Sequence, residues 1–335
     1  MNLHSQLDSP GNRVYVYNFL TTISKENIVS SILKDLQSKP RKISCKFLYD
    51  SKGSRLFKEI TKLPEYYLSR IESILIKKYV ELHPENLYGI DIIELGSGDC
   101  SKISLILQSA TKHEPNVLKY IPFDVSIEAL LESAQVLTNI FTNLEVHCIV
   151  GDFFFQLDKI PFSRKKLFCF FGSSIGNFSY AERLDFFRNI SLLMNPGDIF
   201  LLGVDMIKDQ ILLENAYNDS QKVTSLFNLN ILNVVNSLTG TDFNPEHFEH
   251  LAFFNRTFSR MEMHLQALQN ITVQIAGLST KFYIPKGETI HTENSYKFTY
   301  DQIVRELQTA QLQVSSFLSD SNNWFSLFEI VKSNL

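Results

Sequence analysis

Short apolar runs alternate with amphipathic helical patterns between about residues 71 and 206. The runs include "GIDIIEL", "KYIPFDVS", "VHCIVGDF", "KLFCFFGSS" and "DIFLLGVDM", and stretches such as "SIEALLESAQVLTNIF" lie between them. Buried strands that alternate with helices are typical of β-α-β units and a parallel sheet. The pattern therefore predicts an α/β fold built on a Rossmann-like sheet.

The pattern changes between residues 207 and 297, where helical stretches precede strand-like ones such as "FSRMEMHLQAL" and "ETIHTENSYKF". The chain then closes with a helical pattern, "YDQIVRELQTAQL", and two strand candidates, "QVSSFLSD" and "WFSLFEIVK". The first 70 residues mix a strand-like start, a helical stretch and an aromatic segment. We predict two domains interleaved in sequence, a Rossmann-like domain of residues 71–206 and 298–335, and an α+β domain of residues 1–70 and 207–297.

Composition narrows the class of protein. The chain has 335 residues, 44% of them hydrophobic, and a net charge of −4, which gives no basic face for nucleic acid or an anionic membrane. Its densest basic run, "SRKK" at 163–166, is expected in a solvated loop. The four cysteines form no C-x-x-C pair, and no signal peptide or membrane span is evident. We expect a cytoplasmic protein, a monomer, that binds a small molecule.

The segment "IIELGSGDCSK" places Glu94, Gly96 and Gly98 between a strand pattern and a helix pattern. Glycines at such a turn let a ligand approach the backbone, and the amides at the helix N-terminus add favourable dipoles. A dinucleotide fingerprint requires a third glycine three residues after Gly98, where Ser101 stands. A cofactor held through a pyrophosphate is therefore disfavoured.

Acidic residues end the next two strand patterns. Asp124 in "IPFDVS" is placed to bind ribose hydroxyls, and Asp152 with Phe153 in "VGDFF" suits an adenine amine and ring. A glycine turn, a ribose acid and an adenine acid in this order favour S-adenosylmethionine and a methyltransferase. For each acid taken singly a helix cap is the alternative, and for the set the alternative is a structural Rossmann domain with capped turns.

Six segments distributed along nearly the whole chain support a family assignment: "LYDSKGSRLFKEITKLPEYYLSR", "IIELGSGDCSK", "FFGSSIGNF", "AYND", "FSRMEMHL" and "GETIHTENSYKF". With them the sequence resembles the histidine-specific, S-adenosylmethionine-dependent Nα-methyltransferases of ergothioneine biosynthesis. The resemblance implies a class I methyltransferase sheet with an interleaved substrate-binding domain. It also implies successive methylation of L-histidine to hercynine, with S-adenosyl-L-homocysteine as the product of the cofactor.

The resemblance assigns residues to two sites. The cofactor site then comprises the turn residues already named and Lys102, Asp124, Asp152 and Phe153. The substrate site comprises Tyr49, Tyr67, Gly172, Asn177, Tyr217, Met263, Glu293 and Ser295, with core packing as the alternative for Met263. Tyr49 and Asn177 are the candidate catalytic residues.

Glu293 and Ser295 lie two positions apart in a strand pattern, so their side chains share one face. A carboxylate and a hydroxyl can together hydrogen-bond both nitrogens of an imidazole. An apolar indole would leave the carboxylate without a partner, at a cost in desolvation. Glu293 therefore favours histidine over an indole-bearing amino acid, which is the alternative substrate.

Tyrosines are expected to orient the amino-acid backbone of the substrate. Tyr217, with Tyr67 and Asn177, would fix the α-carboxylate and α-amine. Tyrosine has an ordinary pKa near 10 and is a poor base at neutral pH, so Tyr49 is assigned to orienting the amine. A catalytically silent cofactor-binding protein is the alternative from a different functional class.

The histidines offer no metal site by their spacing. His247 and His250 in "PEHFEH" lack the i, i+4 spacing of a helical zinc pair and are expected on a surface helix. His264 and His291 fall in strand patterns near the substrate residues, where packing or hydrogen bonding is the expected role. We therefore predict chemistry without a metal ion.

Overall fold

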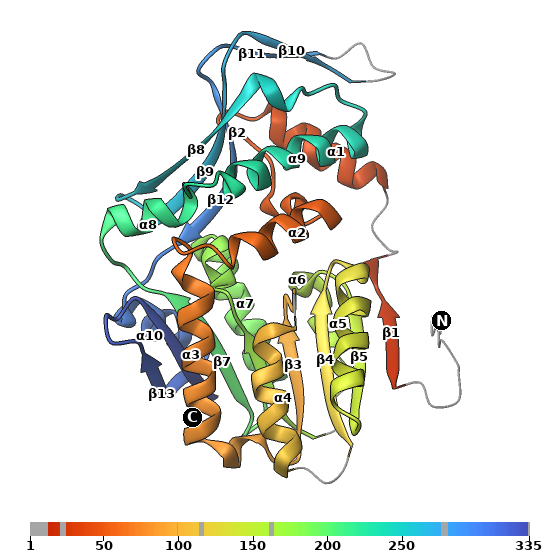
Figure 1. Ribbon diagram of the computed structural model, residues 1–335, viewed down its shortest axis with the longest axis vertical. Helices are drawn as coiled ribbons and strands as arrows, with labels where there is room; N and C mark the ends of the chain where they lie inside the picture. The colour runs from red at the N-terminus through yellow and green to blue at the C-terminus, as the bar shows by residue number, and fades with distance from the viewer. Residues whose placement is uncertain are drawn as a thin grey trace. The chain divides into compact units, whose positions relative to one another are not determined.

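The computed structural model describes residues 13–20, 25–98, 100–113, 117–160, 164–275 and 281–333. Among these residues the chain divides into two compact units (Figure 1). Unit 1 lies within Met1–Thr21, Leu68–Ile207 and Phe298–Leu335, and unit 2 lies within Thr22–Tyr67 and Lys208–Lys297. Unit 1 is therefore formed by three separate segments of the chain, and unit 2 by two.

Unit 1 is built on an eight-stranded sheet. In spatial order its strands are β1 (Val14–Asn18), β5 (Leu144–Val150), β4 (Leu118–Asp124), β3 (Ile90–Leu95), β6 (Lys165–Phe170), β7 (Ile199–Asp205), β14 (Phe325–Lys332) and β13 (Leu312–Ser319). The first six run parallel, whereas β14 is antiparallel to β7 and to β13. This arrangement confirms the predicted α/β, Rossmann-like fold.

Helices cover both faces of this sheet. In Figure 1, α3 (Tyr67–Leu82), α4 (Ser101–His113) and α5 (Ile127–Ile140) lie on one face, with α7 (Tyr180–Leu193) on the other. Helix α10 (Tyr300–Gln308) packs on α7 and β13. Short helices follow α3 and strands β5 and β6: η3 (Pro84–Leu87), α6 (Phe153–Gln156), η4 (Leu157–Lys159) and η5 (Ser174–Asn177).

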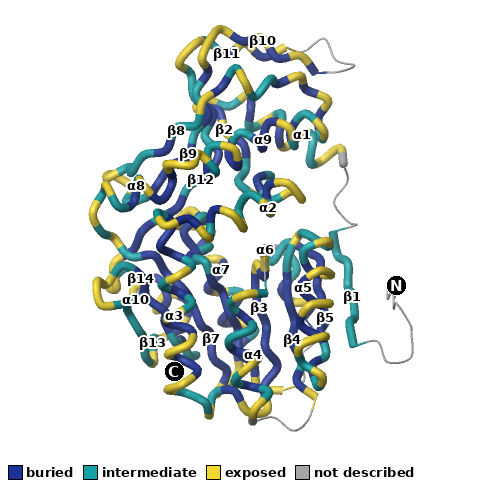
Figure 2. The backbone as a smooth tube through the Cα atoms, in the orientation of Figure 1, coloured by how far each residue is buried: buried dark blue, intermediate teal, exposed yellow. Residues whose placement is uncertain are grey.

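The central strands form the core of unit 1, as the buried colour of β3 and β7 in Figure 2 shows. The basic run at 163–166 does not lie wholly in a solvated loop, contrary to expectation, because its last two residues begin β6. Lys166 is only 2% exposed, and its Nζ lies 2.7 Å from Asp198 Oδ2. The ion pair with Asp198, 32 residues further along the chain, offsets part of the desolvation cost of burying the Lys166 charge.

The N-terminal strand changes the predicted domain boundary. Residues 1–70 were assigned to the second domain, but β1 pairs in parallel with β5 and so belongs to unit 1. Arg13 fixes this edge by donating to the carbonyl oxygens of Thr138 and Phe141. The strand pattern was visible in the sequence, but its partner was not. The first 12 residues lie outside the described part of the chain.

Unit 2 contains a four-stranded sheet in the order β2 (Arg41–Lys42), β12 (Thr289–Tyr296), β9 (Arg260–Ala267) and β8 (Phe248–Asn255). A separate hairpin joins β10 (Ile271–Gln274) to β11 (Lys281–Ile284). Helix α9 (Val223–Thr239) packs on β8 and β9, and α1 (Lys25–Gln37) and α2 (Ser51–Ile60) pack on α9. Helix α8 (Gln210–Tyr217) also contacts β8, and the short helices are η2 (Cys45–Leu48) and η6 (Pro245–His247).

The surface helix predicted for "PEHFEH" is wrong. Only the short η6 turn forms there, and His250 lies inside strand β8, where it pairs opposite Leu265. Its ring contacts the Asn228 side-chain amide and the carbonyl oxygen of Tyr217, each at 2.9 Å. Burial lowers the pKa of His250 below its ordinary value. Pairing with β9 has therefore outweighed the local helical pattern.

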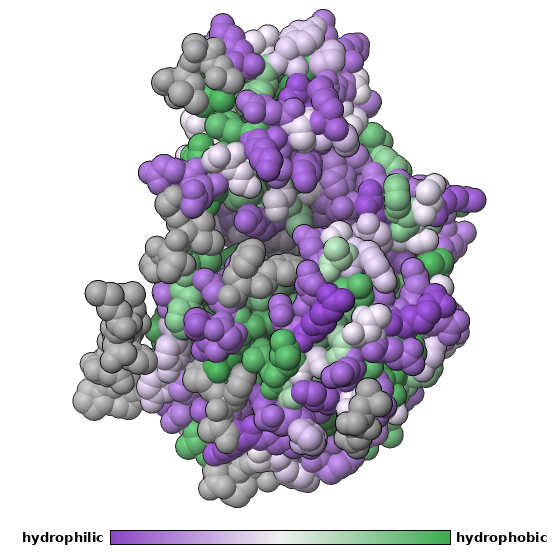
Figure 3. Space-filling model, turned by 180° about the vertical axis from the view of Figure 1, so that it is seen from behind, coloured by the Kyte–Doolittle hydropathy of each residue, from purple (hydrophilic) through white to green (hydrophobic). Residues whose placement is uncertain are grey.

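Hydrophilic residues cover much of the face shown in Figure 3, with apolar residues among them. Exposed large apolar side chains such as Leu192 and Ile211 belong to different helices, α7 and α8. Such scattered residues are normal on a globular protein. No helix in the described part of the chain is long and apolar enough to cross a membrane.

Candidate active site

The glycine turn lies at the carboxyl end of β3, immediately before α4. Gly96 and Gly98 have φ angles of +65° and +48°, a left-handed conformation that glycine adopts without strain. The Gly98 N–H donates to Asp124 Oδ2 at 3.3 Å, so the turn is tied to the end of β4. The backbone conformation therefore favours glycine at both positions, a reason that adds to the predicted approach of a ligand.

The predicted cofactor residues gather at one edge of the sheet. Strands β3, β4 and β5 are neighbours and parallel, and the glycine turn, Asp124 and Asp152 end or follow them in that order. Ligands in open α/β sheets bind at this carboxyl edge. Desolvation raises the pKa of Asp124, while N–H donors from Ser126 and Gly98 oppose the shift. Phe153 follows Asp152 and packs its ring against Phe123 and Phe170.

Glu94 lies one residue before the end of β3 and is 3% exposed. Its Oε2 accepts a hydrogen bond from the Tyr120 hydroxyl of the neighbouring strand β4. Desolvation, and then the Glu94 charge, raise the pKa of Tyr120 well above its ordinary value. The tyrosine therefore remains a donor, and it holds the Glu94 carboxylate in place beside the turn.

Lys102 stands in the first turn of α4 and is held by an acid that the sequence did not single out. Its Nζ lies 2.6 Å from Oε2 of Glu72, a fully buried residue of α3. Both Glu72 oxygens also lie 2.8 Å from the backbone nitrogen of Gly172. One carboxylate thus links Lys102 of the cofactor set with Gly172 of the substrate set.

The "GSSIGN" segment follows β6 at the same edge of the sheet. Gly172 has a φ of +76° and Ser173 a φ of +58°, so the chain turns sharply into η5, which ends at Asn177. The Ser173 hydroxyl oxygen accepts from the backbone N–H of Asp205 at 2.9 Å, which ties the turn to the end of β7. Unit 1 therefore contains Gly172 and Asn177 together with the cofactor residues.

In unit 2, Glu293 and Ser295 share the buried face of β12, as the alternation predicted. They are 8% and 5% exposed and stand opposite Met263 and Met261 of β9. A bulge between His291 and Glu293 interrupts the register. The bulge preserves the predicted face for residues 293 and 295, and Met263 lies directly opposite Glu293.

Ser295 belongs to a buried group of three polar side chains. The Tyr217 hydroxyl, at the end of α8, donates to Ser295 Oγ at 2.8 Å. Lys297 Nζ lies 2.9 Å from Ser295 Oγ and 3.1 Å from the Tyr217 hydroxyl. Lys297 is only 1% exposed. This lysine follows the end of β12, two residues beyond Ser295, and was not among the predicted site residues.

Two further predicted tyrosines lie in unit 2. Tyr49 packs edge-on against Phe57 and Phe227. Desolvation and then the charge of Glu293 raise its pKa well above the ordinary value, which fits a hydroxyl that donates and does not act as a base. Tyr67 accepts a hydrogen bond from Lys208 Nζ at 2.8 Å, and the ammonium also lies over its ring.

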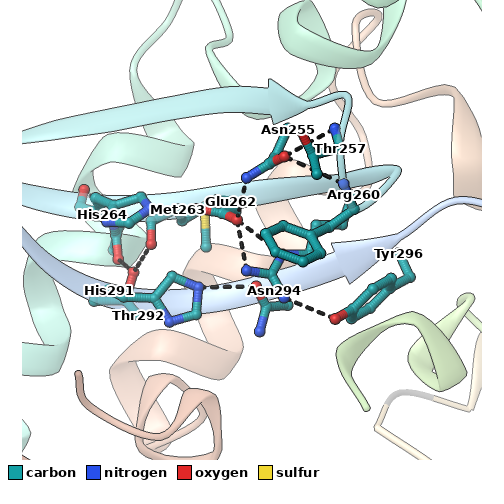
Figure 4. A network of polar contacts seen from close by, with 12 residues as sticks. Asn255, Thr257, Arg260, Glu262, Met263, His264, His291, Thr292, Asn294 and Tyr296 are labelled. Atoms are coloured by element: carbon teal, nitrogen blue, oxygen red, sulfur yellow. Dashed lines mark hydrogen bonds and ion pairs between the residues drawn. The ribbon is translucent and has the colours of Figure 1, made fainter. Parts of the chain in front are cut away.

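The opposite face of the same sheet carries a polar network, shown in Figure 4. Glu262 Oε1 accepts from Arg260 and Asn255, and its Oε2 lies 3.0 Å from His264 Nε2. His291 Nε2 lies 2.9 Å from Asn294 Oδ1. Because Glu262 and Asn294 pair opposite each other, these side chains share one face, away from Glu293.

A ligand atom from each of Glu262, His264 and His291 lies within 4.8 Å of the others, a spacing from which a metal could be considered. Both carboxylate oxygens of Glu262 are already occupied by donors, one of them the Arg260 guanidinium, whose charge opposes a cation. His264 and His291 each make one side-chain hydrogen bond, the role expected for them, and His264 Nδ1 is buried without a hydrogen-bond partner among the described residues. Their predicted nearness to the substrate residues holds only along the strands, since they lie on the other face.

Known proteins give the same assignment as the sequence motifs. The family model described as "Histidine-specific methyltransferase, SAM-dependent" matches residues 28–332. The chain is 36% identical over 313 residues to the histidine N-alpha-methyltransferase of Mycolicibacterium smegmatis, covering 92% of this chain and 97% of the relative. It is 34% identical over 296 residues to the enzyme of that name from Mycobacterium tuberculosis, covering 88% and 92%.

A third relative is larger. Ergothioneine biosynthesis protein 1 of Schizosaccharomyces pombe is 33% identical over 273 residues, which make up 78% of this chain but 35% of the relative. The family match spans both units of the fold, including the strands that carry Glu293 and the glycine turn. This chain belongs to the family of histidine-specific, S-adenosylmethionine-dependent methyltransferases.

Proposed function

We propose that this protein transfers methyl groups from S-adenosylmethionine to the α-amino nitrogen of L-histidine, in three steps that end at Nα,Nα,Nα-trimethylhistidine (hercynine), the first step of ergothioneine biosynthesis. The observation that supports histidine as the substrate is the buried pair Glu293 and Ser295 on one face of β12. An ionised carboxylate only accepts hydrogen bonds, and the N–H of an imidazole ring is a donor that suits it.

The cofactor residues fit S-adenosylmethionine. The left-handed glycines leave the backbone accessible, since a Cβ added at Gly96 or Gly98 would meet nothing closer than 3.9 Å. Asp124 and Asp152 offer carboxylates at the ends of neighbouring strands for a ribose and an adenine amine. When bound, the cofactor supplies an electrophilic methyl group on a sulfonium. We assign its binding to Glu94, Gly96, Gly98, Lys102, Asp124, Asp152 and Phe153.

The remaining residues position the substrate. Tyr67, Tyr217 and Asn177 are assigned to the α-carboxylate and α-amine, and Met263, opposite Glu293, to the wall beside the ring. Methyl transfer to an amine depends on alignment and desolvation rather than on strong acid–base chemistry. The raised pKa of Tyr49 supports its assignment to orienting the amine. Gly172, with the small residues that follow it, leaves space as the amine gains methyl groups.

Mass spectrometry tests substrate and reaction together. Purified protein is incubated with S-adenosylmethionine and an equimolar mixture of the twenty amino acids, and the products are identified by mass. Trimethylated histidine as the sole product is the expected result. Methylation of a different amino acid, such as tryptophan, would keep the fold and cofactor but overturn the assignment of Glu293. Absence of any methylated product would favour a catalytically silent cofactor-binding protein.

The proposal extends to the partners, the location and the oligomeric state of the protein. The net charge of −4 and the small-molecule substrate support a protein that acts on a free amino acid, without nucleic acid or a membrane as partner. We propose that the protein is cytoplasmic, since the four cysteines form no disulfide framework in the sequence, and that it is a monomer. Gel filtration of the purified protein with light-scattering detection tests the monomeric state.

A further inference from the structure

We propose that Lys297 fixes the hydrogen-bond directions at the substrate site, so that Ser295 offers only a donor, Glu293 only an acceptor, and the site binds the neutral imidazole ring in one orientation. The inference rests on the proposed function and specifies which form of histidine is bound. All the side chains that carry it belong to unit 2.

The first step is the direction of each bond. A lysine ammonium has three donors and no acceptor. Lys297 therefore donates to both hydroxyl oxygens, Ser295 Oγ at 2.9 Å and the Tyr217 oxygen at 3.1 Å. The Tyr217 hydroxyl in turn donates to Ser295 Oγ at 2.8 Å. Ser295 Oγ thus accepts two hydrogen bonds within the protein.

The second step follows from the capacity of a hydroxyl, which has one donor and two acceptor lone pairs. With both lone pairs of Ser295 occupied, only its own hydrogen is left for a ligand. A ring nitrogen that meets Ser295 must therefore carry a lone pair. An ionised carboxylate at Glu293 accepts only, so the ring nitrogen that meets Glu293 must carry a hydrogen.

Neutral imidazole satisfies both conditions, because it has one N–H and one bare nitrogen. Imidazolium has two N–H groups, and one of them would face the Ser295 donor without an acceptor in a buried site. The Glu293 charge alone would favour imidazolium. Lys297, two positions beyond Ser295 and hydrogen-bonded to its hydroxyl, opposes that preference with its own positive charge.

Other titratable groups surround the site on the elements packed there. Tyr217 comes from α8, Cys45 from η2, and Tyr66 from the segment before α3. Together with Glu293 these groups act electrostatically on Tyr49, which follows η2, and Glu293 is the one carboxylate among them. Lys208 donates to the Tyr67 hydroxyl in the same unit and serves as a matched lysine that does not share the Ser295 contact.

The test compares two substrates that differ in the basicity of the ring. Histidine has a ring pKa of about 6.5, whereas β-(1,2,4-triazol-3-yl)alanine keeps a neutral ring, with one N–H and bare nitrogens, at mildly acidic pH. Values of kcat/KM are measured for both from about pH 5 to 8. The two substrates have the same α-amine and react with the same cofactor, so the ratio of their kcat/KM values reports the effect of the ring alone.

For the natural protein the ratio of histidine to triazolylalanine is expected to fall about tenfold per pH unit below pH 6.5. In Lys297→Met one lone pair of Ser295 is released and can accept from imidazolium, so the fall is expected to disappear. Lys208→Met, the matched control, is expected to keep it. A ratio that stays flat in the natural protein overturns the proposal, as does a Lys297→Met variant that keeps the full slope.

A second variant and a separate readout of the proposed function complete the test of Lys297. If Lys297→Met does not fold, Ser295→Ala takes its place, because removal of the donor is expected to flatten the ratio, and an unchanged slope in that variant overturns the proposal. Failure of the proposed function is seen separately, as no methylation of histidine at any pH. If histidine is methylated but the ratio of the two kcat/KM values does not change with pH, the proposed function is retained and only the role of Lys297 is overturned.

Discussion

Gly203→Ala tests whether the Glu72 carboxylate holds the edge of the sheet where the cofactor residues lie. Gly203 lies within β7, and a Cβ there would lie 1.9 Å from Glu72 Oε1 and 3.0 Å from its Cδ. The carboxylate must therefore move, and it then loses its 2.8 Å contacts with the Gly172 nitrogen and its 2.6 Å pair with Lys102. Overpacking costs about 1–3 kcal/mol, and a broken buried ion pair about 3–5 kcal/mol.

Because the Lys102 side chain is 17% exposed, water compensates part of the broken pair, and we expect a loss of about 2–4 kcal/mol in the free energy of unfolding. Urea unfolding followed by tryptophan fluorescence measures it, since the single tryptophan, Trp324, lies next to β14 in unit 1. Calorimetric titration with S-adenosylmethionine measures whether Lys102 keeps its place, and weaker binding is expected.

A double-mutant cycle makes the reasoning refutable. Glu72→Ala removes the group that the new Cβ would meet, although it is itself destabilising because the Gly172 N–H loses its acceptor. In that background Gly203→Ala is expected to cost less than about 1 kcal/mol, which gives a coupling energy of about 2 kcal/mol. Additive costs would show that the glycine is needed for a reason other than the carboxylate.

Four further outcomes follow from the structure. Glu293→Ala is expected to lower kcat/KM for histidine by about 10–100-fold, since a hydrogen bond to a charged group contributes about 1.5–3 kcal/mol, while calorimetry shows unchanged binding of S-adenosylmethionine. Tyr49→Phe is expected to lower kcat without changing its pH profile between about pH 7 and 9, and a lost ionisation there would make Tyr49 a base. Lys166→Met should reduce stability to urea by about 3–5 kcal/mol, with part recovered when Asp198→Asn is added. Burial lowers the pKa of His291 to about 4, so the unfolded chain binds its proton more readily and stability falls as pH drops from about 6.5 towards 4; His291→Gln should flatten that part of the stability profile.

Local sequence patterns were sufficient to predict the alternating strands and helices of unit 1 and the glycine turn, because both depend on residues that are neighbours in the sequence. The face shared by Glu293 and Ser295 was predictable for the same reason. Glu72 was not, since its partners Lys102 and Gly172 lie far along the chain and meet only in the fold.

Other differences between prediction and structure arise because the sequence does not show which distant residues a side chain or strand contacts. Lys297 stands two positions after Ser295, but a lone lysine in a sequence is ordinarily assigned to solvent, and its contacts with Ser295 and Tyr217 are evident only in the fold. His250 looked helical beside Pro245, and pairing with β9 made it part of a strand. The N-terminal strand needed knowledge of β5 before it could be assigned to unit 1.

The order of the strands in space has a consequence for synthesis on the ribosome. Strand β14 is made long after β7 and lies between β7 and β13, and β2 pairs with β12, which is made long after it. Until those segments emerge, the nascent chain exposes the edge of β7 and lacks a partner for β2, a situation that invites pairing with other chains. Unit 2 cannot be completed before β12 has left the exit tunnel, and unit 1 cannot be completed before β14 has, so both sheets keep an unpaired strand edge for much of the synthesis.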